Sequence, residues 1–314
     1  MLYRNFALEA VRVTEDAAMA AARAMGRGNS INADMVAVKA MRKALGSVNF
    51  RGRVVIGEGE KDDSPMLFIN EEVGGADAPV VDIAVDALEG ATIVATGGTN
   101  ALSVLAVGEE GSFFYTPDTY MLKIAVGPQA AGVIDIAKSP TENLGAISKA
   151  LERPVEELTV VMLDRPRHEK LIDEVRKAGA MIRLISDGDV AAAIATAKED
   201  TGVDVLMGTG GAPEGVLAAA ALRCMGGNFQ GILKPRNREE IERAKKMGIK
   251  NVEKVLTMED LAPGNIMFAA TGVTDGELLR GVRFFKGGAR TNSLVLRSHP
   301  KTIRYLQTTH HLFY

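Results

Sequence analysis

The chain has 314 residues, of which 46% are hydrophobic and 25% charged, and its formal net charge is -3. This balance is typical of a globular protein with one large domain or two fused halves, and it excludes a disordered chain. The missing basic block argues against nucleic acid as a partner. No apolar run reaches the roughly 18 residues of a membrane-spanning helix.

The single cysteine, Cys224, cannot form an internal disulfide. The first residues do not combine a charged start, an apolar core and a cleavage site, so we expect no secretory signal. A cytoplasmic location follows as the default expectation.

Two helices are predicted at the start of the chain. Apolar residues at helical spacing indicate a helix over residues 7–25, ended by Gly26 and Gly28. A second helix over residues 30–45 is expected to be capped by Ser30 or Asn32. Asp34 then lies in its first turn, where the helix dipole alone would explain a carboxylate.

Strands dominate the next hundred residues. A strand at 53–56 opens into an acidic loop at 57–63, whose glycines allow Glu58 to turn back. Residues 81–85 alternate as in a half-buried strand that carries Asp86 and Glu89 into a turn at Gly90. Apolar residues continue at 93–95 and 101–107, a hairpin at 108–111 leads to a strand at 112–115, and another strand covers 121–126. This half is predicted to form a largely antiparallel sheet.

The second half has a different rhythm. A capping box at Ser139 and Glu142 with Pro140 predicts a helix to about Leu151. Strands at 158–163, 181–185, 203–207 and 229–233 then alternate with helices at 168–178, 190–197 and 215–225, which indicates a mainly parallel sheet. A helix at 238–247 and strands from 266 onward, at 282–285 and 291–296, complete the chain. We expect two halves, 1–155 and 156–314, packed together as one unit.

Acidic residues mark a candidate metal site. Five of them stand at strand ends or a helix start, namely Asp34, Glu58, Asp86, Glu89 and Glu214. If they share one cleft, each like-charged pair about 4 Å apart costs about 4 kcal/mol at an effective dielectric near 20. Two divalent cations would offset that repulsion, and oxygen ligands suit Mg²⁺ or Mn²⁺ rather than zinc. The alternative is that these are scattered surface carboxylates.

Three loops of the parallel sheet are expected to converge, because ligands bind beyond the carboxyl ends of its strands. They comprise residues 164–168, 186–189 and 208–215. The first carries Arg165, Arg167 and His168, a cationic group suited to phosphate and disfavoured at a helix start by the dipole. The glycine-rich third loop lacks the Lys-Ser/Thr ending of a P-loop and is either an anion site or a tight turn.

Together these motifs resemble the bacterial class II fructose-1,6-bisphosphatases. The resemblance is carried by residues 56–60, 81–90, 117–121, 165–168, 186–191, 211–215 and 268–272. It implies the lithium-sensitive sugar-phosphatase fold, an α/β fold layered as an α-β-α-β-α sandwich. It also implies metal-dependent hydrolysis of the 1-phosphate of fructose-1,6-bisphosphate, and in some relatives of sedoheptulose-1,7-bisphosphate.

The resemblance also implies roles for individual residues. Metal ligands map onto Asp34, Glu58, Asp86, Glu89 and Glu214, with catalytic roles for Glu58, Asp86, Glu89 and the position of Ala91. Substrate contacts map onto Glu89, Gly90, Ala91, Tyr120, Arg165, Pro166, Arg167, His168, Asp187, Gly188, Asp189 and Gly211. A homodimer or homotetramer is expected, without nucleic acid or membrane partners.

Two residues depart from the family motif. The family usually has Asp-Pro-x-Glu-Gly-Thr where this chain has Asp86-Ala87-Leu88-Glu89-Gly90-Ala91. The missing threonine is the more serious departure, because its hydroxyl activates water in the family and Thr92 points elsewhere. Three functions stay open: a metal-dependent sugar bisphosphatase of reduced rate, a catalytically silent sugar-phosphate binder, and a phosphatase similar to inositol monophosphatase.

Overall fold

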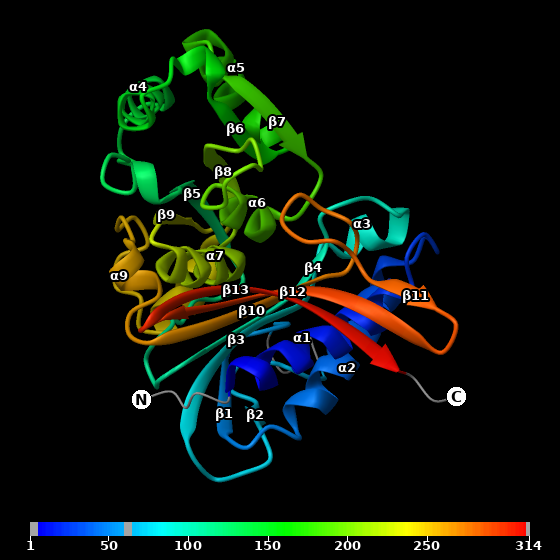
Figure 1. The fold of residues 1–314 in the computed structure, drawn as a ribbon. Coiled ribbons are helices and arrows are strands. Elements are labelled where there is room, and N and C mark those ends of the chain that lie inside the picture. Colours follow the sequence, from blue (N-terminus) through cyan, green and yellow to red (C-terminus); the bar gives the residue numbers. More distant parts are fainter. Residues whose placement is uncertain (1–5, 60–64, 312–314) are drawn as a thin grey trace. The chain divides into compact units, whose positions relative to one another are not determined.

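The computed structural model describes residues 6–59 and 65–311 of the chain. It divides into two compact units, one formed by Met1–Phe113 with Pro263–Tyr314 and the other by Phe114–Ala262 (Figure 1). The second unit is therefore inserted into the first. The boundary expected near residue 155 lies inside the inserted unit, because the C-terminal strands return to pair with strands from the start of the chain.

The first unit is built on an eight-stranded sheet within the described residues. Its order is β11-β12-β10-β4-β3-β1-β2, with β13 paired to the other side of β12. Only β1 and β3 run parallel among these pairs. The strands are β1 (Arg51–Ile56), β2 (Glu72–Val73), β3 (Val80–Glu89), β4 (Leu102–Gly108), β10 (Ile266–Gly272), β11 (Arg283–Phe285), β12 (Gly288–Ser298) and β13 (Lys301–His311).

Among the described residues of this unit, three helices accompany the sheet: α1 (Phe6–Ala22), α2 (Ser30–Leu45) and α3 (Ala91–Thr96). Helix α1 packs on α2 and across β10, β4 and β12. Ala17, Ala18 and Ala21 of α1 are fully buried, and their small side chains allow close approach to those neighbours. The core of the unit gathers at this contact and includes Ile83 and Val85 of β3.

The second unit is built on a five-stranded sheet of order β7-β6-β8-β5-β9. Its strands are β5 (Tyr120–Val126), β6 (Thr159–Leu163), β7 (Met181–Ile185), β8 (Val205–Gly211) and β9 (Asn228–Lys234). β7, β6 and β8 run parallel, whereas β5 is antiparallel to both β8 and β9. The mixed α/β fold with one mostly antiparallel and one mostly parallel sheet is therefore confirmed.

Helices lie on both faces of the second sheet. The α-helices are α4 (Pro140–Leu151), α5 (Glu169–Ala178), α6 (Asp189–Ala195), α7 (Ala212–Met225), α8 (Arg238–Lys246) and α9 (Met258–Leu261). Short 3-10 turns are η1 (Pro128–Ala130), η2 (Val155–Glu157) and η3 (Pro166–His168). Ile124 of β5 shares a core with Ile147 of α4 and Ile172 of α5. Met121, on the opposite face of β5, meets α7 at Gly215.

Several local predictions hold, among them the complete capping box at Ser139 and Glu142. The strand expected at 112–115 is wrong, since these residues form an irregular segment that follows the turn at residues 110–111. Residues 93–95 belong to α3 and do not continue the sheet. The cap of α2 is Asn29, whose side chain accepts a hydrogen bond from the Asn32 amide, so Asp34 lies beyond the first turn.

Candidate functional site

A bulge at the end of β3 orients two acidic residues. Asp86 pairs with Val104 of β4, but Glu89 pairs with Leu102, so three steps along β3 match two steps along β4. On a regular strand, residues three apart point to opposite faces. The extra residue of the bulge turns Asp86 and Glu89 to the same face. Glu89 is only 3% exposed and Asp86 is half-buried.

At the bulge, the amides of Ala87 and Leu88 do not pair with β4, and each donates a hydrogen bond to a carboxylate instead. Glu58 Oε1 accepts a hydrogen bond from the Ala87 amide at 2.9 Å. Asp86 Oδ1 accepts one from the Leu88 amide at 3.1 Å. Glu58 therefore does turn back to Asp86, as the glycines around it suggested, and the two carboxylates lie at consecutive amides.

A chain of contacts fixes the segment that carries Glu58. Its amide donates to Leu67 O at 3.0 Å, and Leu67 adopts a left-handed conformation with φ of 55°. The Leu67 amide donates to Glu71 Oε2, and Arg42 of α2 donates through Nε to Glu71 Oε1. A Cβ at Gly57 would come within 2.0 Å of Leu67 O, so this approach requires glycine. Arg42 and Glu71 thus fix Leu67, whose carbonyl accepts the hydrogen bond from the Glu58 amide.

Asp34 has a different electrostatic character from a helix-dipole carboxylate. It lies on α2, which packs on α3 and β3, and its pKa is raised above the ordinary value by burial. A carboxylate stabilised by the helix N-terminus would show the opposite shift. A positive charge placed nearby would therefore stabilise the ionised form of the half-buried Asp34 carboxylate.

Gly90 and Ala91 follow the bulge. Gly90 is the N-cap of α3 with φ of 93°, a conformation that favours glycine, and Ala91 is the first helical residue. Ala91 is half-buried and brings no hydroxyl, whereas Thr92 is exposed. The hydroxyl of Thr92 stands one helical position, about 100°, away from the Ala91 side chain.

In the second unit, Glu214 lies in a buried polar cluster. Lys123 is 3% exposed and its Nζ donates to Asp189 Oδ2 at 2.6 Å. Glu214 Oε2 is closed to solvent and has no hydrogen-bond partner among the described residues. Burial raises the pKa of Glu214 and Asp189 acts in the same direction, against the lowering effect of Lys123. A Cβ at Gly211 would lie 1.8 Å from Glu214 Oε2, so glycine makes room for this carboxylate.

The donor chemistry fits a hard divalent cation, although no ligand cluster is assembled. Within residues 6–59 and 65–311, no group of three or more His, Cys, Asp or Glu side chains is arranged to hold a metal ion. All five candidates nevertheless offer carboxylate oxygens. Burying Glu214 Oε2 without a hydrogen-bond donor costs folding free energy, and a coordinated cation would offset that cost.

The sugar-phosphate candidates of the second unit gather at one edge of its sheet. Tyr120 at the start of β5 pairs with Gly211 at the end of β8 and with Lys234 at the end of β9. β6 and β7 run parallel to β8, so the loops that carry Arg165 and Asp187 leave from the same edge. The three loops predicted from the sequence therefore share an edge within this unit.

The arginines at this edge are held by backbone carbonyls. Arg165 donates to Asp164 O and Ser186 O at 2.9 and 2.7 Å. Arg167 donates to Thr209 O through Nε and Nη2 at 3.0 and 2.8 Å, and its guanidinium lies 4.6 Å from the centre of the Tyr120 ring. Pro166, between them, opens η3. Both side chains are thus oriented before any anion binds.

His168 differs from the expected phosphate contact. Its Nδ1 lies 2.7 Å from Leu163 O, and its Nε2 accepts a hydrogen bond from the Thr209 amide at 2.7 Å. Both ring nitrogens therefore contact backbone groups, and the residue is only 2% exposed. Burial lowers its pKa, as do the neighbouring arginines. His168 acts as a neutral structural residue that holds β6 to β8.

The segment 187–189 caps a helix. Asp187 Oδ1 accepts a hydrogen bond from the Gly188 amide at 3.1 Å, and burial raises the pKa of Asp187. Gly188 has φ of 90° at the N-cap of α6, and Asp189 opens that helix while paired with Lys123. The two carboxylates therefore have different surroundings, since Asp187 is partly buried before the helix and Asp189 is buried against a lysine.

A residue that the sequence interpretation missed lies beside Tyr120. The Arg236 guanidinium stands 4.9 Å from the centre of the Tyr120 ring. The signal was available, since Lys234-Pro235-Arg236 follows a strand and precedes a helix at the predicted ligand-binding edge. It was overlooked because its proximity to Tyr120 depends on β5 lying between β8 and β9.

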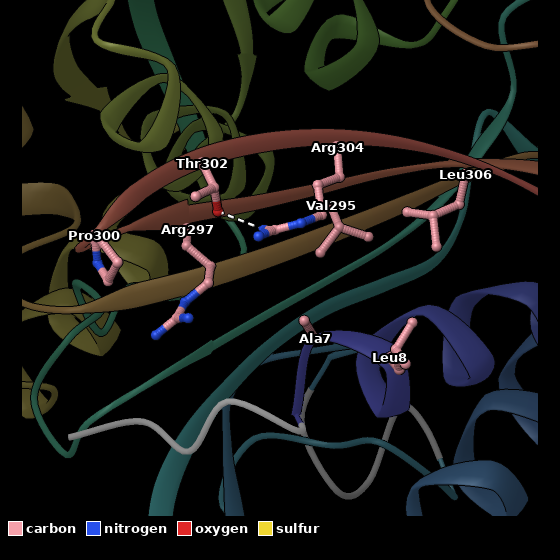
Figure 2. Close-up of a pocket in the computed structure, with 8 residues that line it drawn as sticks. All are labelled: Ala7, Leu8, Val295, Arg297, Pro300, Thr302, Arg304 and Leu306. Atoms are coloured by element: carbon pink, nitrogen blue, oxygen red, sulfur yellow. Dashed lines mark hydrogen bonds between the residues drawn. The ribbon is translucent and has the colours of Figure 1, made fainter.

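A separate pocket of about 460 Å³ lies in the first unit between α1 and the β12–β13 hairpin (Figure 2). Arg304 donates there to Thr302 Oγ1 at 2.7 Å. None of the site residues named from the sequence lines it. The lining residues are Ala7, Leu8, Val295, Arg297, Pro300, Thr302, Arg304 and Leu306.

No helix of the described segments combines the length and apolar character needed to cross a bilayer.

Comparison with known proteins identifies the family. A profile described as bacterial fructose-1,6-bisphosphatase, glpX-encoded, matches residues 4–310. The chain belongs to this family. The resemblance seen in the sequence motifs is thereby confirmed, and the match includes every candidate site residue in both units. The family is one of metal-dependent phosphatases.

Three relatives carry the name D-fructose 1,6-bisphosphatase class 2/sedoheptulose 1,7-bisphosphatase. They come from Crocosphaera subtropica, Synechocystis sp. and Microcystis aeruginosa, with 51%, 50% and 49% identity. Each comparison covers 96% of this chain and 95% of the relative. The similarity to these fructose-1,6-bisphosphatases thus extends over nearly the whole length of both proteins.

Proposed function

We propose that the protein hydrolyses the 1-phosphate of fructose-1,6-bisphosphate to give fructose-6-phosphate and phosphate, and that it also accepts sedoheptulose-1,7-bisphosphate. The observation that carries this proposal is the family match over residues 4–310, together with close relatives named for both activities. Gluconeogenesis and the reductive pentose phosphate pathway are the routes that use such a reaction.

The proposed metal ligands are the carboxylates of Asp34, Glu58, Asp86 and Glu89 in the first unit. Support comes from the bulge that turns Asp86 and Glu89 to one face and from the raised pKa of Asp34. Glu214 of the second unit is proposed as a ligand from the family resemblance and from its buried oxygen without a donor. Bound Mg²⁺ or Mn²⁺ would supply Lewis-acid stabilisation of the charge on the reacting phosphoryl group.

The proposed role of Arg165 and Arg167 is to bind the phosphate that is not hydrolysed. Their guanidinium groups are oriented by carbonyl oxygens at the edge of the sheet. Binding energy from this remote phosphate would position the reacting one. Tyr120, Asp187, Gly188, Asp189 and Gly211 are proposed to contact the sugar phosphate at the same edge.

A second candidate is a sugar-phosphate binder with impaired catalysis. Two observations favour it: Ala91 carries no hydroxyl, and Glu58 already accepts a hydrogen bond from Ala87. A binder would keep its affinity for fructose-6-phosphate but release no phosphate from the bisphosphate.

The test is phosphate release from each bisphosphate with Mg²⁺ and with Mn²⁺, measured beside calorimetric binding of fructose-6-phosphate. An active enzyme releases phosphate from fructose-1,6-bisphosphate, and a binder shows the calorimetric signal alone. Asp86→Ala should weaken metal binding at least tenfold, about 1.4 kcal/mol. An unchanged metal isotherm in that variant would contradict the proposed ligand set.

We also propose that the protein works in the cytoplasm as a homodimer or homotetramer. The support is the family resemblance and the presence of one cysteine, the buried Cys224, which cannot form a disulfide within the chain. Sedimentation analysis of the purified chain tests the assembly state.

A further inference from the structure

Arg236 enters the candidate sugar-phosphate edge on a fourth loop. It follows β9 by two residues and precedes Asn237, whose side chain caps α8 by accepting a hydrogen bond from the Glu240 amide. Lys234, at the end of β9, is the register partner of Tyr120. The loop that carries Arg236 therefore leaves the sheet beside the tyrosine.

Two cations converge on that tyrosine. The guanidinium carbons of Arg167 and Arg236 lie 4.6 and 4.9 Å from the centre of the Tyr120 ring. Each contact is a favourable cation–π interaction. Two like charges near one ring nevertheless repel each other, and an anion between or beside them would relieve that repulsion. Guanidinium groups suit a phosphate in particular, because their planar forks match its oxygens.

A buried carboxylate holds Arg236 in this position. Glu240 is 2% exposed, and it accepts hydrogen bonds from Thr119 Oγ1 at 2.6 Å, from the Arg236 amide at 2.8 Å and from Arg236 Nε. Thr119 directly precedes Tyr120, so one carboxylate ties the tyrosine's strand to the arginine's loop. The Arg236 side chain is still 45% exposed and so open to a ligand.

A second acid lies nearby without closing off the arginine. Asp118 Oδ2 stands 3.9 Å from Arg236 Nη2, and the Asp118 side chain is 71% exposed. Exposed pairs of this kind contribute little. Arg236 Nη2 also donates a long hydrogen bond to Asp118 O at 3.5 Å. The buried Glu240 therefore orients Arg236, and the arginine side chain stays 45% exposed with Asp118 beside it.

We infer that Arg236 is a further substrate-binding residue. Together with Arg167 it binds the terminal phosphate that is not hydrolysed, and Glu240 is its positioning residue. This inference rests on the proposed function, since it assigns Arg236 to the sugar-phosphate site of that reaction.

The first test is calorimetric binding of fructose-6-phosphate, which carries the terminal phosphate and requires no turnover. Arg236→Met should weaken binding about 10- to 100-fold, because a charge-assisted hydrogen bond is lost. Arg236→Lys should fall between wild type and Arg236→Met, because lysine keeps the charge without the fork. Arg238→Met is the matched control: Arg238 is also exposed and lies only two residues further, at the start of α8.

The second test separates positioning from binding. Glu240→Gln should raise KM for fructose-1,6-bisphosphate several-fold with a smaller change in kcat, because the guanidinium stays present but is no longer fixed. Arg236→Met should lower kcat/KM for the bisphosphate more than for a small aryl phosphate, which has no remote phosphate.

The results distinguish failure of the Arg236 assignment from failure of the proposed hydrolysis. Unchanged fructose-6-phosphate affinity in folded Arg236→Met, or an equal loss in Arg238→Met, overturns the inference and leaves the proposed function standing. If the wild type releases no phosphate from any sugar bisphosphate, the proposed hydrolysis fails. The calorimetric series still decides the role of Arg236 in that case.

Discussion

The Glu58 carboxylate accepts a hydrogen bond from the main-chain amide of Ala87 at 2.9 Å. The motif of the resembling family has proline at this position, and proline has no amide hydrogen to donate. The departure at residue 87 therefore changes more than the stiffness of a turn. It gives a proposed metal ligand a competing partner inside the protein.

Ala87→Pro is expected to strengthen Mn²⁺ and Mg²⁺ binding about tenfold. The substitution removes the amide that competes for Glu58, and a hydrogen bond to a charged group contributes about 1.5–3 kcal/mol. A bulge tolerates proline because its amides lie outside the ladder. Metal titration by calorimetry measures the effect, and Ala87→Gly, which keeps the donor, is the control. Equal isotherms for wild type and a folded Ala87→Pro would show that the amide does not compete.

Glu71→Gln and Arg42→Met are expected to loosen the segment that carries Glu58. Both break the series of contacts from α2 through Leu67 to Glu58, in which Glu71 is 12% exposed and Arg42 33%. We expect a loss of about 1–3 kcal/mol in the free energy of unfolding, measured in urea, and faster proteolysis near Leu67. The exposed pair of Arg51 and Glu72 offers a control, since Glu72→Gln should cost well under 1 kcal/mol. Similar costs for both glutamates would contradict a supporting role for Glu71.

Much of the fold could be predicted because its signals are local. The capping box at Ser139 and the strand at residues 81–85 depend on neighbours within a few residues, although both faces of that strand are buried and the half-buried character expected from its alternation is wrong. The pairing of β4 with β10 could not, because it joins residues more than 150 positions apart and leaves no local trace. That pairing is why the division placed near residue 155 differs from the two compact units.

The site was predictable to a different extent. The acidic residue types of β3 were visible, but their common face was not, since it depends on a bulge defined by the register with β4. His168 was assigned a phosphate from its charge class, whereas burial and two backbone partners make it neutral. The sequence shows which residues can be charged, but burial and hydrogen-bond partners in the fold decide whether they are charged.

Protonation of His168 is expected to weaken the folded state. Its folded pKa lies below the ordinary value, so the unfolded chain binds the proton first as the pH falls. The contribution of the neutral ring is fully present above the unfolded pKa, about 6.5, and is lost as the pH falls through that value toward the folded pKa. NMR titration of the histidine ring protons should find one ring that titrates below the usual range, absent in His168→Asn. The stability difference between wild type and His168→Asn should shrink from pH 7.5 to pH 5.5, and a constant difference would contradict the assignment.

Ala91→Thr is expected to raise phosphate release from fructose-1,6-bisphosphate by about 10²- to 10⁴-fold, the range of a positioned proton acceptor. Residue 91 opens α3 directly after the Glu89–Gly90 turn, so a hydroxyl there would stand next to the proposed ligands and could hold the attacking water in line. Thr92 cannot replace it without rotating the first turn of α3, because its side chain is exposed one helical position away. Steady-state kinetics with Mg²⁺ measures the gain, and metal affinity should change little, since the threonine adds no carboxylate. Ala91→Val matches the shape without the oxygen, so an equal gain from valine would refute the hydroxyl mechanism. If neither variant gains, catalysis is limited elsewhere, and the double variant Ala87→Pro with Ala91→Thr then tests whether the Glu58–Ala87 hydrogen bond sets that limit.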